Sequence, residues 1–340
     1  MKKLGIFGRF LAALQLLPAL ESGEETLVGG QAVLEGVMMR SPHAWGIAVR
    51  KVSGEMVTHS ETLDRPSEKH KWMGWPIVRG VVILGHAMML GFRALRFSAN
   101  VALEEATPKE AKKLEISGWV LAVNLVFSIG FFIFMYKYLP LVATTALQRY
   151  SHSLSSNVAF GLVDGLIRIS LFLLFIWGVS RFKDIHRVFE YHGAEHKTVF
   201  AFESGEPVSI PAAQKFSTYH PRCGTSFLMT VMIISMIVFA VVPATTFWTR
   251  FAVRVALLPV IAGVSYELIR FAGKLLRRQY QGDAAPFWRS GLFVLMTRPG
   301  MWLQRITTQP PADGQVECAI RALDEAMALE KQRGGELVIA

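Results

Sequence analysis

The stretch CGTSFLMTVMIISMIVFAVVPATTFWT, residues 223–249, contains no charged side chain. A helix needs about 20 consecutive apolar residues to cross the hydrocarbon core of a bilayer. This run is therefore long enough to form a transmembrane helix. Three further spans are expected at 116–136, 158–180 and 251–273. The sequence predicts a mainly α-helical membrane protein with about four transmembrane helices.

The composition supports a membrane protein rather than a water-soluble one. Of the 340 residues, 52% are apolar and only 18% are charged, and the mean hydropathy is +0.35. The net charge of +10 does not point to nucleic acid, because Lys and Arg are spread along the chain and form no basic helix. The expected partner is therefore the lipid bilayer. A homo-oligomer or a second membrane protein as partner stays open.

Residues 1–115 are expected to form an N-terminal α+β region that is cytosolic or interfacial. Apolar and polar residues alternate over 45–62 and a turn is expected at Ser53 and Gly54, which predicts a β-hairpin. The uncharged run at 80–92 is too short to cross a bilayer. It predicts a short re-entrant or interfacial helix.

The distribution of Lys and Arg predicts the orientation of the remaining chain. The membrane region 116–273 includes a polar loop at 181–222, and residues 274–340 form a C-terminal tail with an amphipathic helix. The loop carries six Lys and Arg residues, whereas the connection at 137–157 carries two. Positive residues are enriched on the cytosolic side of membrane proteins. Both termini and the loop are therefore expected to face the cytosol.

The polar loop contains residues typical of a metal site. His192 and His196 lie four positions apart and share one face of a helix, with Glu195 directly before the second histidine. The order His-x-x-Glu-His is that of the inverted zincins. His220 and Cys223 follow and are able to complete a tetrahedral shell. The alternative without a metal is that these histidines only form hydrogen bonds at a helix end.

The first functional hypothesis is a zinc-dependent hydrolase at the cytosolic face of the membrane. The two motif histidines and either His220 or Cys223 would bind the metal, and Glu195 would act as general base. Lys197 or Arg222 would hold an anionic group of the substrate. Zinc is the expected cofactor, with iron and manganese as alternatives. The candidate metal ligands are His192, His196, His220, Cys223 and Glu267.

Two other hypotheses remain open. If both motif histidines, His220 and Cys223 all bind zinc, the shell is closed and the metal is structural, as in a membrane scaffold or partner-binding protein. The third hypothesis is a small transporter with a polar path between helices. The charged residues available for that path are Asp164, Arg168, Glu267 and Arg270.

Five sequence motifs resemble those of the bacterial YqhQ family. They are GGQAVLEGVMMR at 29–40, YHGAEHK at 191–197, HPRCGTSF at 220–227, GVSYE at 263–267 and LQRITT at 303–308. The resemblance covers about 29–323. It implies a multi-pass protein of the bacterial inner membrane that is predicted to depend on a metal, and it does not supply a reaction.

Overall fold

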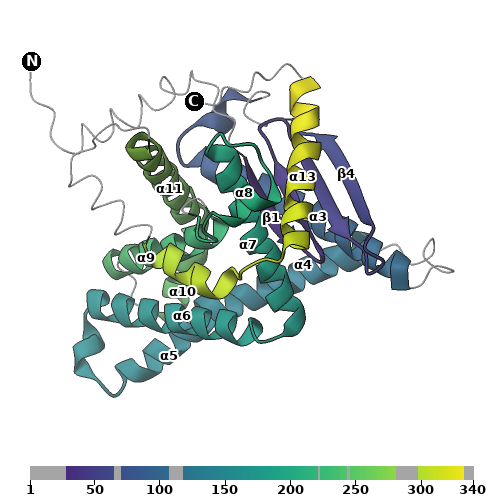
Figure 1. Ribbon diagram of the computed structural model, residues 1–340. Helices are drawn as coiled ribbons and strands as arrows, with labels where there is room; N and C mark the ends of the chain where they lie inside the picture. The colour runs from purple at the N-terminus through teal and green to yellow at the C-terminus, as the bar shows by residue number, and fades with distance from the viewer. Residues whose placement is uncertain are drawn as a thin grey trace, which may run out of the picture.

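The fold consists mainly of helices around one small antiparallel sheet (Figure 1). The computed structural model describes residues 28–64, 70–106, 118–220, 223–242, 246–280 and 298–332. The strands are β1 (Gly29–Val33), β2 (Gly36–Arg40), β3 (Ala44–Arg50) and β4 (Met56–Thr62). They pair in chain order as an antiparallel meander.

The helices fall into long segments joined by short turns. The α-helices are α3 (Val78–Ala106), α4 (Gly118–Ile133), α5 (Leu139–Gln148), α6 (Asn157–Val179), α7 (Lys183–Glu203), α8 (Ile210–Gln214), α9 (Gly224–Val241), α10 (Phe247–Ala256), α11 (Leu258–Tyr280) and α13 (Asp313–Gln332). Short 3₁₀ turns occur at Lys71–Gly74 and His152–Ser155, and a π-helical turn, Phe134–Tyr138, joins α4 to α5. One more helical segment covers 298–307.

The predicted hairpin is confirmed as β3 and β4. Its turn is closed by hydrogen bonds from the amides of Lys51 and Gly54. Gly54 has a φ of +90°, a conformation that side chains with a Cβ rarely adopt. The glycine therefore allows the chain to reverse at the position expected from the sequence.

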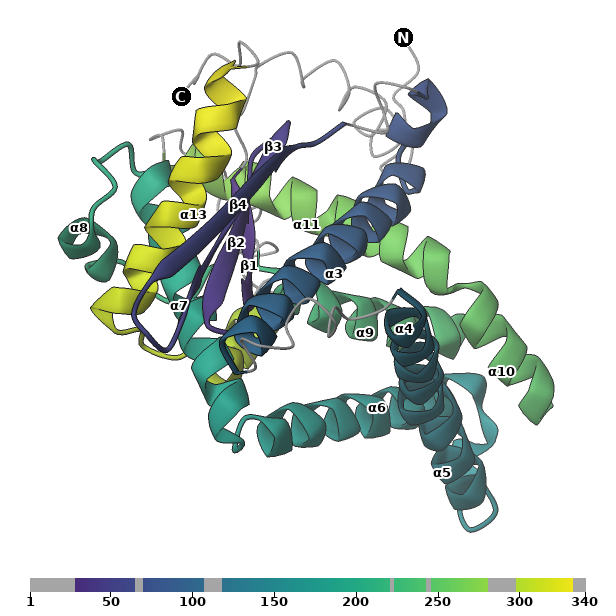
Figure 2. The same cartoon turned by 90° about the vertical axis from the view of Figure 1, so that its right-hand side faces the viewer.

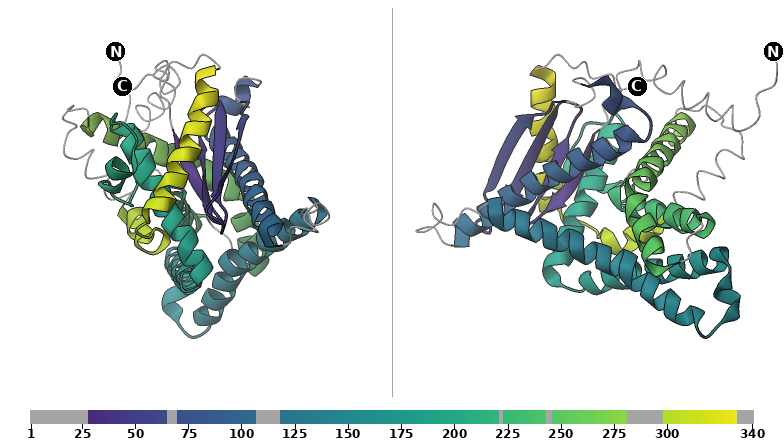
Figure 3. Two further views of the ribbon diagram at one scale, coloured as in Figure 1. Left: turned by 45° about the vertical axis from the view of Figure 1, so that its right-hand side comes forward. Right: turned by 180° about the vertical axis from the view of Figure 1, so that it is seen from behind.

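Helices cover both faces of the sheet (Figure 2). Met38, Trp45 and Ile47 point to the face packed against α3. Val37 and Ala48 point to the opposite face, where α7 and α13 pack. Successive strand residues alternate between faces, so strands with apolar residues at nearly every position are buried on both sides. Figure 3 shows these layers from two further sides.

The C-terminal helix α13 is the main cover of the N-terminal sheet. An added Cβ at Gly46 of β3 would lie 2.6 Å from the backbone oxygen of Ala322, which shows how closely α13 approaches. Glu330 near the end of α13 accepts hydrogen bonds from Ser41 Oγ at 2.6 Å and from the amide of His43 at 2.8 Å. The three-part division at 115 and 273 stays a prediction. The third part nevertheless packs directly on the first.

Among the described residues, four helices are long and apolar enough to cross a membrane. They are Val78–Glu104, Ala122–Gln148, Asn157–Val179 and Gly224–Val241. A fifth candidate is the pair Phe247–Ala256 and Leu258–Arg270, which is bent by 46°. Figure 2 shows α5 and α10 at the end of the molecule away from the sheet, with α6 running from there toward α7.

The prediction of a short helix at 80–92 is wrong in length, because α3 is 29 residues long and runs from Val78 to Ala106. Arg93 and Arg96 limit the uncharged run but do not stop the helix, since arginine is a good helix former. The second half of α3 buries Leu90, Ala94 and Val101 against the sheet. A helix with this buried face is part of the folded core as well as a candidate span.

The predicted span at 116–136 also has different bounds. The helix continues through Lys137 and Pro140 to Gln148. Pro140 lies at the start of α5, directly after the π-helical turn, where a missing amide hydrogen is tolerated. Lys137 and Pro140, which on the basis of the sequence would be expected to end a helix, therefore lie inside one continuous helix.

Candidate metal centre

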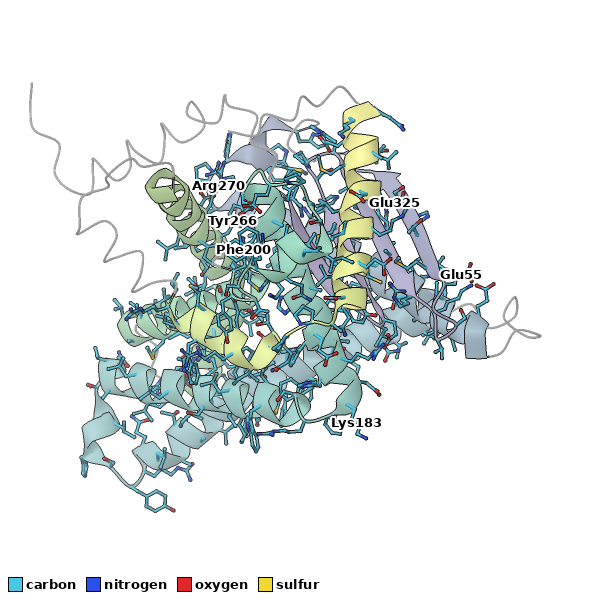
Figure 4. The ribbon with its side chains drawn as sticks, in the orientation of Figure 1. Glu55, Lys183, Phe200, Tyr266, Arg270 and Glu325 are labelled. Atoms are coloured by element: carbon cyan, nitrogen blue, oxygen red, sulfur yellow. The ribbon has the colours of Figure 1, made fainter. Side chains whose placement is uncertain are left out.

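Helix α7 carries the central motif and lies between the sheet and the apolar helices. It packs against β1, β2, α8 and α13. Figure 4 labels Lys183 and Phe200 near the two ends of α7, and the motif lies on the helix between them. The helix contains no proline and ends at Glu203; Ser204 caps it, and Gly205 then adopts a φ of +74°. A glycine in this conformation is a common stop for a helix.

The ligand atoms of three candidate metal ligands converge. One ligand atom each of His192, His196 and Cys223 lies within 4.8 Å of the others. The Sγ atom of Cys223 lies 3.2 Å from Nε2 of His192. Cys223 reaches this position because it caps the N-terminus of α9. Two imidazoles and one thiol are a donor set that suits zinc.

Backbone carbonyl groups orient both imidazole rings. Nδ1 of His192 lies 2.8 Å from the carbonyl oxygen of Thr307, and Nδ1 of His196 hydrogen-bonds to the carbonyl oxygen of Thr218. A carbonyl oxygen accepts, so the Nδ1 atoms carry the protons and each Nε2 has a free lone pair. Metal-binding histidines in proteins are typically held in this way. The residues present therefore fit a metal ion.

Glu195 lies beside the three converging ligand atoms. Its carboxylate oxygen is 3.4 Å from Nε2 of His196, and its side chain is largely buried. An added Cβ at Gly30 would lie 2.7 Å from Cγ of Glu195. Strand β1 therefore lies directly against Glu195 at Gly30.

His220 is a neighbour of the three converging residues but not one of them. Its ring centroid is 5.7 Å from that of His196, and its Nε2 atom faces Glu203 at 3.4 Å. Burial lowers the pKa of His220 to about 4, so its imidazole is neutral at pH 7. Burial likewise lowers the pKa of His196. The structure therefore separates the four motif ligands into a group of three and a flanking histidine.

The remaining predicted site residues have other positions. Lys197 is buried, and its Nζ atom donates to the carbonyl oxygens of Gln214 at 2.8 Å and Phe216 at 2.7 Å. Arg222 lies outside the described residues. Both carboxylate oxygens of Glu267 bind the guanidinium of Arg79, at 2.6 and 2.5 Å. Glu267 therefore forms an ion pair with Arg79 and does not lie with the three converging ligands.

The charged residues considered for a transport path are also paired in part. Asp164 binds Arg168, and its second oxygen lies 2.5 Å from Nη1 of Arg254. Figure 4 labels Arg270 on α11, close to Tyr266. The carboxylate of Asp164 thus joins α6 to α10 rather than lying unpaired between helices.

Several residues of the site were not predicted as functional. Gln304 is fully buried and donates to the carbonyl oxygen of His220 at 2.8 Å and to Ser226 Oγ at 2.9 Å. Its side-chain oxygen accepts from the amide of His220 at 2.7 Å. The motif at 303–308 contained this residue, but a glutamine in a helix gives no sign of such a bridge. Thr218 and Thr307 act through backbone carbonyls, which every residue type has.

Comparisons with known proteins agree with the motifs. The sequence model of a family described as "Protein of unknown function (DUF1385)" matches residues 75–329. The chain is 34% identical over 309 residues to the "Uncharacterized protein YqhQ" of Bacillus subtilis (strain 168), covering 89% of this chain and 92% of that protein. No solved structure matches the chain. The predicted resemblance is therefore confirmed. The chain belongs to the DUF1385 family, whose sequence model covers residues 75–329 of this chain.

Proposed function

We propose that this protein is a zinc-dependent hydrolase that acts at the cytosolic face of the bacterial inner membrane. The observation that carries the proposal is the convergence of His192, His196 and Cys223, with the carboxylate of Glu195 at 3.4 Å from the second histidine. Three protein ligands leave a fourth position for water or substrate, which is typical of catalytic zinc sites. A structural site would use four protein ligands.

The position of His220 favours the catalytic hypothesis over the structural one. A closed shell needs a fourth ligand, and His220 was the candidate for it. Its Nε2 atom faces Glu203, and both its amide and its carbonyl group are held by Gln304. The side chain of His220 thus contacts α7, and its backbone is held by the segment 298–307, beside the three converging ligands.

The roles of the protein groups follow from their contacts. A zinc ion in this site would polarise a water molecule and lower its pKa. Glu195 would accept the proton of the attacking water and deliver it to the leaving group. The carbonyl oxygens of Thr218 and Thr307 keep the two imidazoles in the ligating orientation. Burial of Glu195 excludes bulk water from the proton transfer.

The membrane location rests on the apolar helices and the distribution of positive charge. Four to five helices are apolar enough to cross a bilayer. Cys223 lies at the first turn of one of them, α9, so the metal centre is expected at the membrane surface. Because the segment 181–222 is rich in Lys and Arg, the proposed surface is the cytosolic one.

Cobalt substitution tests whether the shell is open. In protein loaded with Co²⁺, we expect an absorption band from the thiolate of Cys223 that is lost in Cys223→Ser. Acetohydroxamate, a small chelating anion, is expected to change the visible spectrum by entering the free position. His220→Asn should keep the metal. A spectrum that does not respond to acetohydroxamate, together with metal loss in His220→Asn, would support a structural site instead.

Hydrolysis is tested with the Glu195→Gln variant. Extracts of bacterial membranes and cytosol are incubated with the wild-type protein or with the variant and compared by mass spectrometry. We expect products of water addition that form only with the wild type, while both proteins retain the metal. Glu206→Gln, an exposed position after the same helix, is the matched control and should behave like the wild type. Equal products from the wild type and Glu195→Gln would exclude the general-base role.

A further inference from the structure

A second group of charged residues lies in the apolar part of the molecule, far from the metal centre. Lys137, Arg168 and Arg254 are each at least nine-tenths buried, and all three surround the ring of Phe239, at 5.1, 5.3 and 5.4 Å from its centroid. Phe239 is 16 positions after Cys223, which corresponds to about 24 Å along a helix. This cluster therefore belongs to the opposite end of α9.

The cluster contains more positive than negative charge. Within the described part of the chain, Asp164 is the carboxylate that binds Arg168 and Arg254. Its two oxygens are used by Arg168 and Arg254, and the Nε atom of Arg168 is buried without a hydrogen-bond partner among the described residues. Buried charges in apolar surroundings are normally paired. One carboxylate does not offset two guanidinium groups and the neighbouring amine of Lys137.

A small pocket of about 20 Å³, which opens to the surface, lies next to this cluster. It lies between the first turn of α6, the end of α9 and α10, and it is lined by Asn157, Phe160, Arg250 and Arg254. The guanidinium of Arg250 stacks over the Phe160 ring at 3.8 Å. Because Asn157 is the first residue of α6, the pocket also faces the positive end of a 23-residue helix. Its arginines and this helix end all favour an anion.

We propose that a phosphate group, supplied by an anionic lipid or by free phosphate, binds at the mouth of this pocket and places one of its oxygen atoms inside. Planar guanidinium groups are well suited to phosphate oxygens, and a bound phosphate would offset the excess charge of the cluster. Exposed apolar side chains flank the pocket, among them Val158 and Trp248. Tryptophan is frequent at membrane interfaces. In the proposed topology the pocket faces the leaflet opposite to the metal centre.

The test compares two arginine variants in the purified full-length protein. Inorganic phosphate, dioleoyl phosphatidylglycerol and zwitterionic dioleoyl phosphatidylcholine are each titrated in a neutral detergent. We expect Arg250→Gln to weaken binding of the anionic ligand at least about tenfold, because one charge-assisted contact is lost. Arg149→Gln removes the same charge at an exposed site and should bind like the wild type. Arg254 is left intact because it also holds Asp164.

The ligands distinguish the two sources of phosphate. Tight binding of phosphatidylglycerol without binding of inorganic phosphate identifies a lipid site, and equal binding of both identifies a site for free phosphate. The proposal is overturned if Arg250→Gln and Arg149→Gln bind alike, or if the wild type binds neither phosphatidylglycerol nor phosphate more tightly than phosphatidylcholine.

A second variant tests the excess of positive charge directly. Lys137→Met removes one buried cation and keeps a side chain of similar length. Without added anion, this variant is expected to unfold at a higher temperature than the wild type, because the cost of burying the amine and its repulsion with Arg168 and Arg254 are both removed. A lower unfolding temperature would mean that Lys137 is compensated within the chain, and the premise of an anion site would fail.

Discussion

Gly193 lies between the two histidines of the metal centre and faces the backbone of residues 307–309. An added Cβ would lie 2.1 Å from the carbonyl oxygen of Gln309. Gly193→Ala is expected to push this segment away and to weaken the contact of Thr307 with His192, at a cost of about 1–3 kcal/mol in stability. Thermal unfolding and zinc content of the purified protein measure both effects.

The control for this change is a glycine in open space. A Cβ added at Gly178 in α6 meets no described atom within 4 Å. Gly178→Ala should leave zinc content unchanged and stabilise the helix by up to about 1 kcal/mol. If Gly193→Ala behaves like Gly178→Ala, the segment 307–309 does not position His192.

Gln304 is the residue that ties His220 to the helical segment 298–307. Gln304→Leu removes three hydrogen bonds and takes away the side-chain acceptor of the His220 amide, while the His220 carbonyl still accepts from the amide of Cys223. The expected loss of stability is about 1–3 kcal/mol for each buried group that stays unpaired. Gln332→Leu at the exposed end of α13 is the control and should unfold like the wild type. Equal unfolding of both variants would contradict the bridging role.

At the scale of elements, Arg79 and Glu267 join the start of α3 to α11. Both side chains are about nine-tenths buried. Arg79→Met leaves the carboxylate of Glu267 buried and unpaired, so we expect a loss of about 3–5 kcal/mol. The double variant Arg79→Met/Glu267→Leu should recover much of this stability. Both proteins should keep their metal, and metal loss in the double variant would restore Glu267 as a candidate ligand.

The contact between α13 and the sheet predicts a dependence on pH. Burial alone would raise the pKa of Glu330, but hydrogen bonds from Ser41 and His43 outweigh it and hold the pKa below the ordinary value of 4.5. Stability from this group is therefore present above pH 4.5 and is lost as pH falls through the lower folded value. Glu330→Gln should be less stable at pH 7 and should lose less stability on acidification.

An exposed carboxylate on the sheet provides the comparison for Glu330. Glu55, labelled in Figure 4, pairs with Lys51 at 3.0 Å on the surface of the hairpin. Exposed ion pairs contribute little to stability. Unfolding curves of Glu55→Gln from pH 3 to pH 7 should follow those of the wild type. A Glu330→Gln variant with the same curves would contradict the role of Glu330.

At the scale of the whole molecule, the proposed topology is tested by labelling. Tyr150 is 90% exposed between α5 and α6, on the side predicted to face away from the cytosol. In intact cells, a membrane-impermeant maleimide is expected to label Tyr150→Cys and not Lys183→Cys, and both should react after the cells are opened. Labelling of Lys183→Cys alone in intact cells would reverse the proposed orientation.

The sequence predicted local features better than long-range ones. The hairpin turn at Gly54 and the shared helix face of His192 and His196 follow from spacing and residue type, whereas the choice between His220 and Cys223 as the third converging ligand stayed open. Arg79, the partner of Glu267, lies 188 positions away in the chain, so no local sequence pattern predicts this ion pair. The packing of α13 on the sheet likewise joins residues that lie far apart in the chain.

Helix ends were also hard to predict from the sequence. Charged residues mark the predicted limits of the apolar helices, but Lys137 lies buried over the ring of Phe239 within a continuous helix. Likewise, α3 runs on past Arg93 because its second half packs against the sheet. In both cases tertiary contacts, rather than local charge, determine how far the helix extends.

The metal content of the detergent-purified protein tests the central claim most directly. Elemental analysis of protein purified without chelator should give about one zinc per chain in the wild type, as expected for a single site. The metal should be lost in His196→Ala and retained in His186→Ala, a half-exposed histidine of the same helix. A wild type without stoichiometric metal, or equal metal in the two histidine variants, would contradict a metal centre on α7.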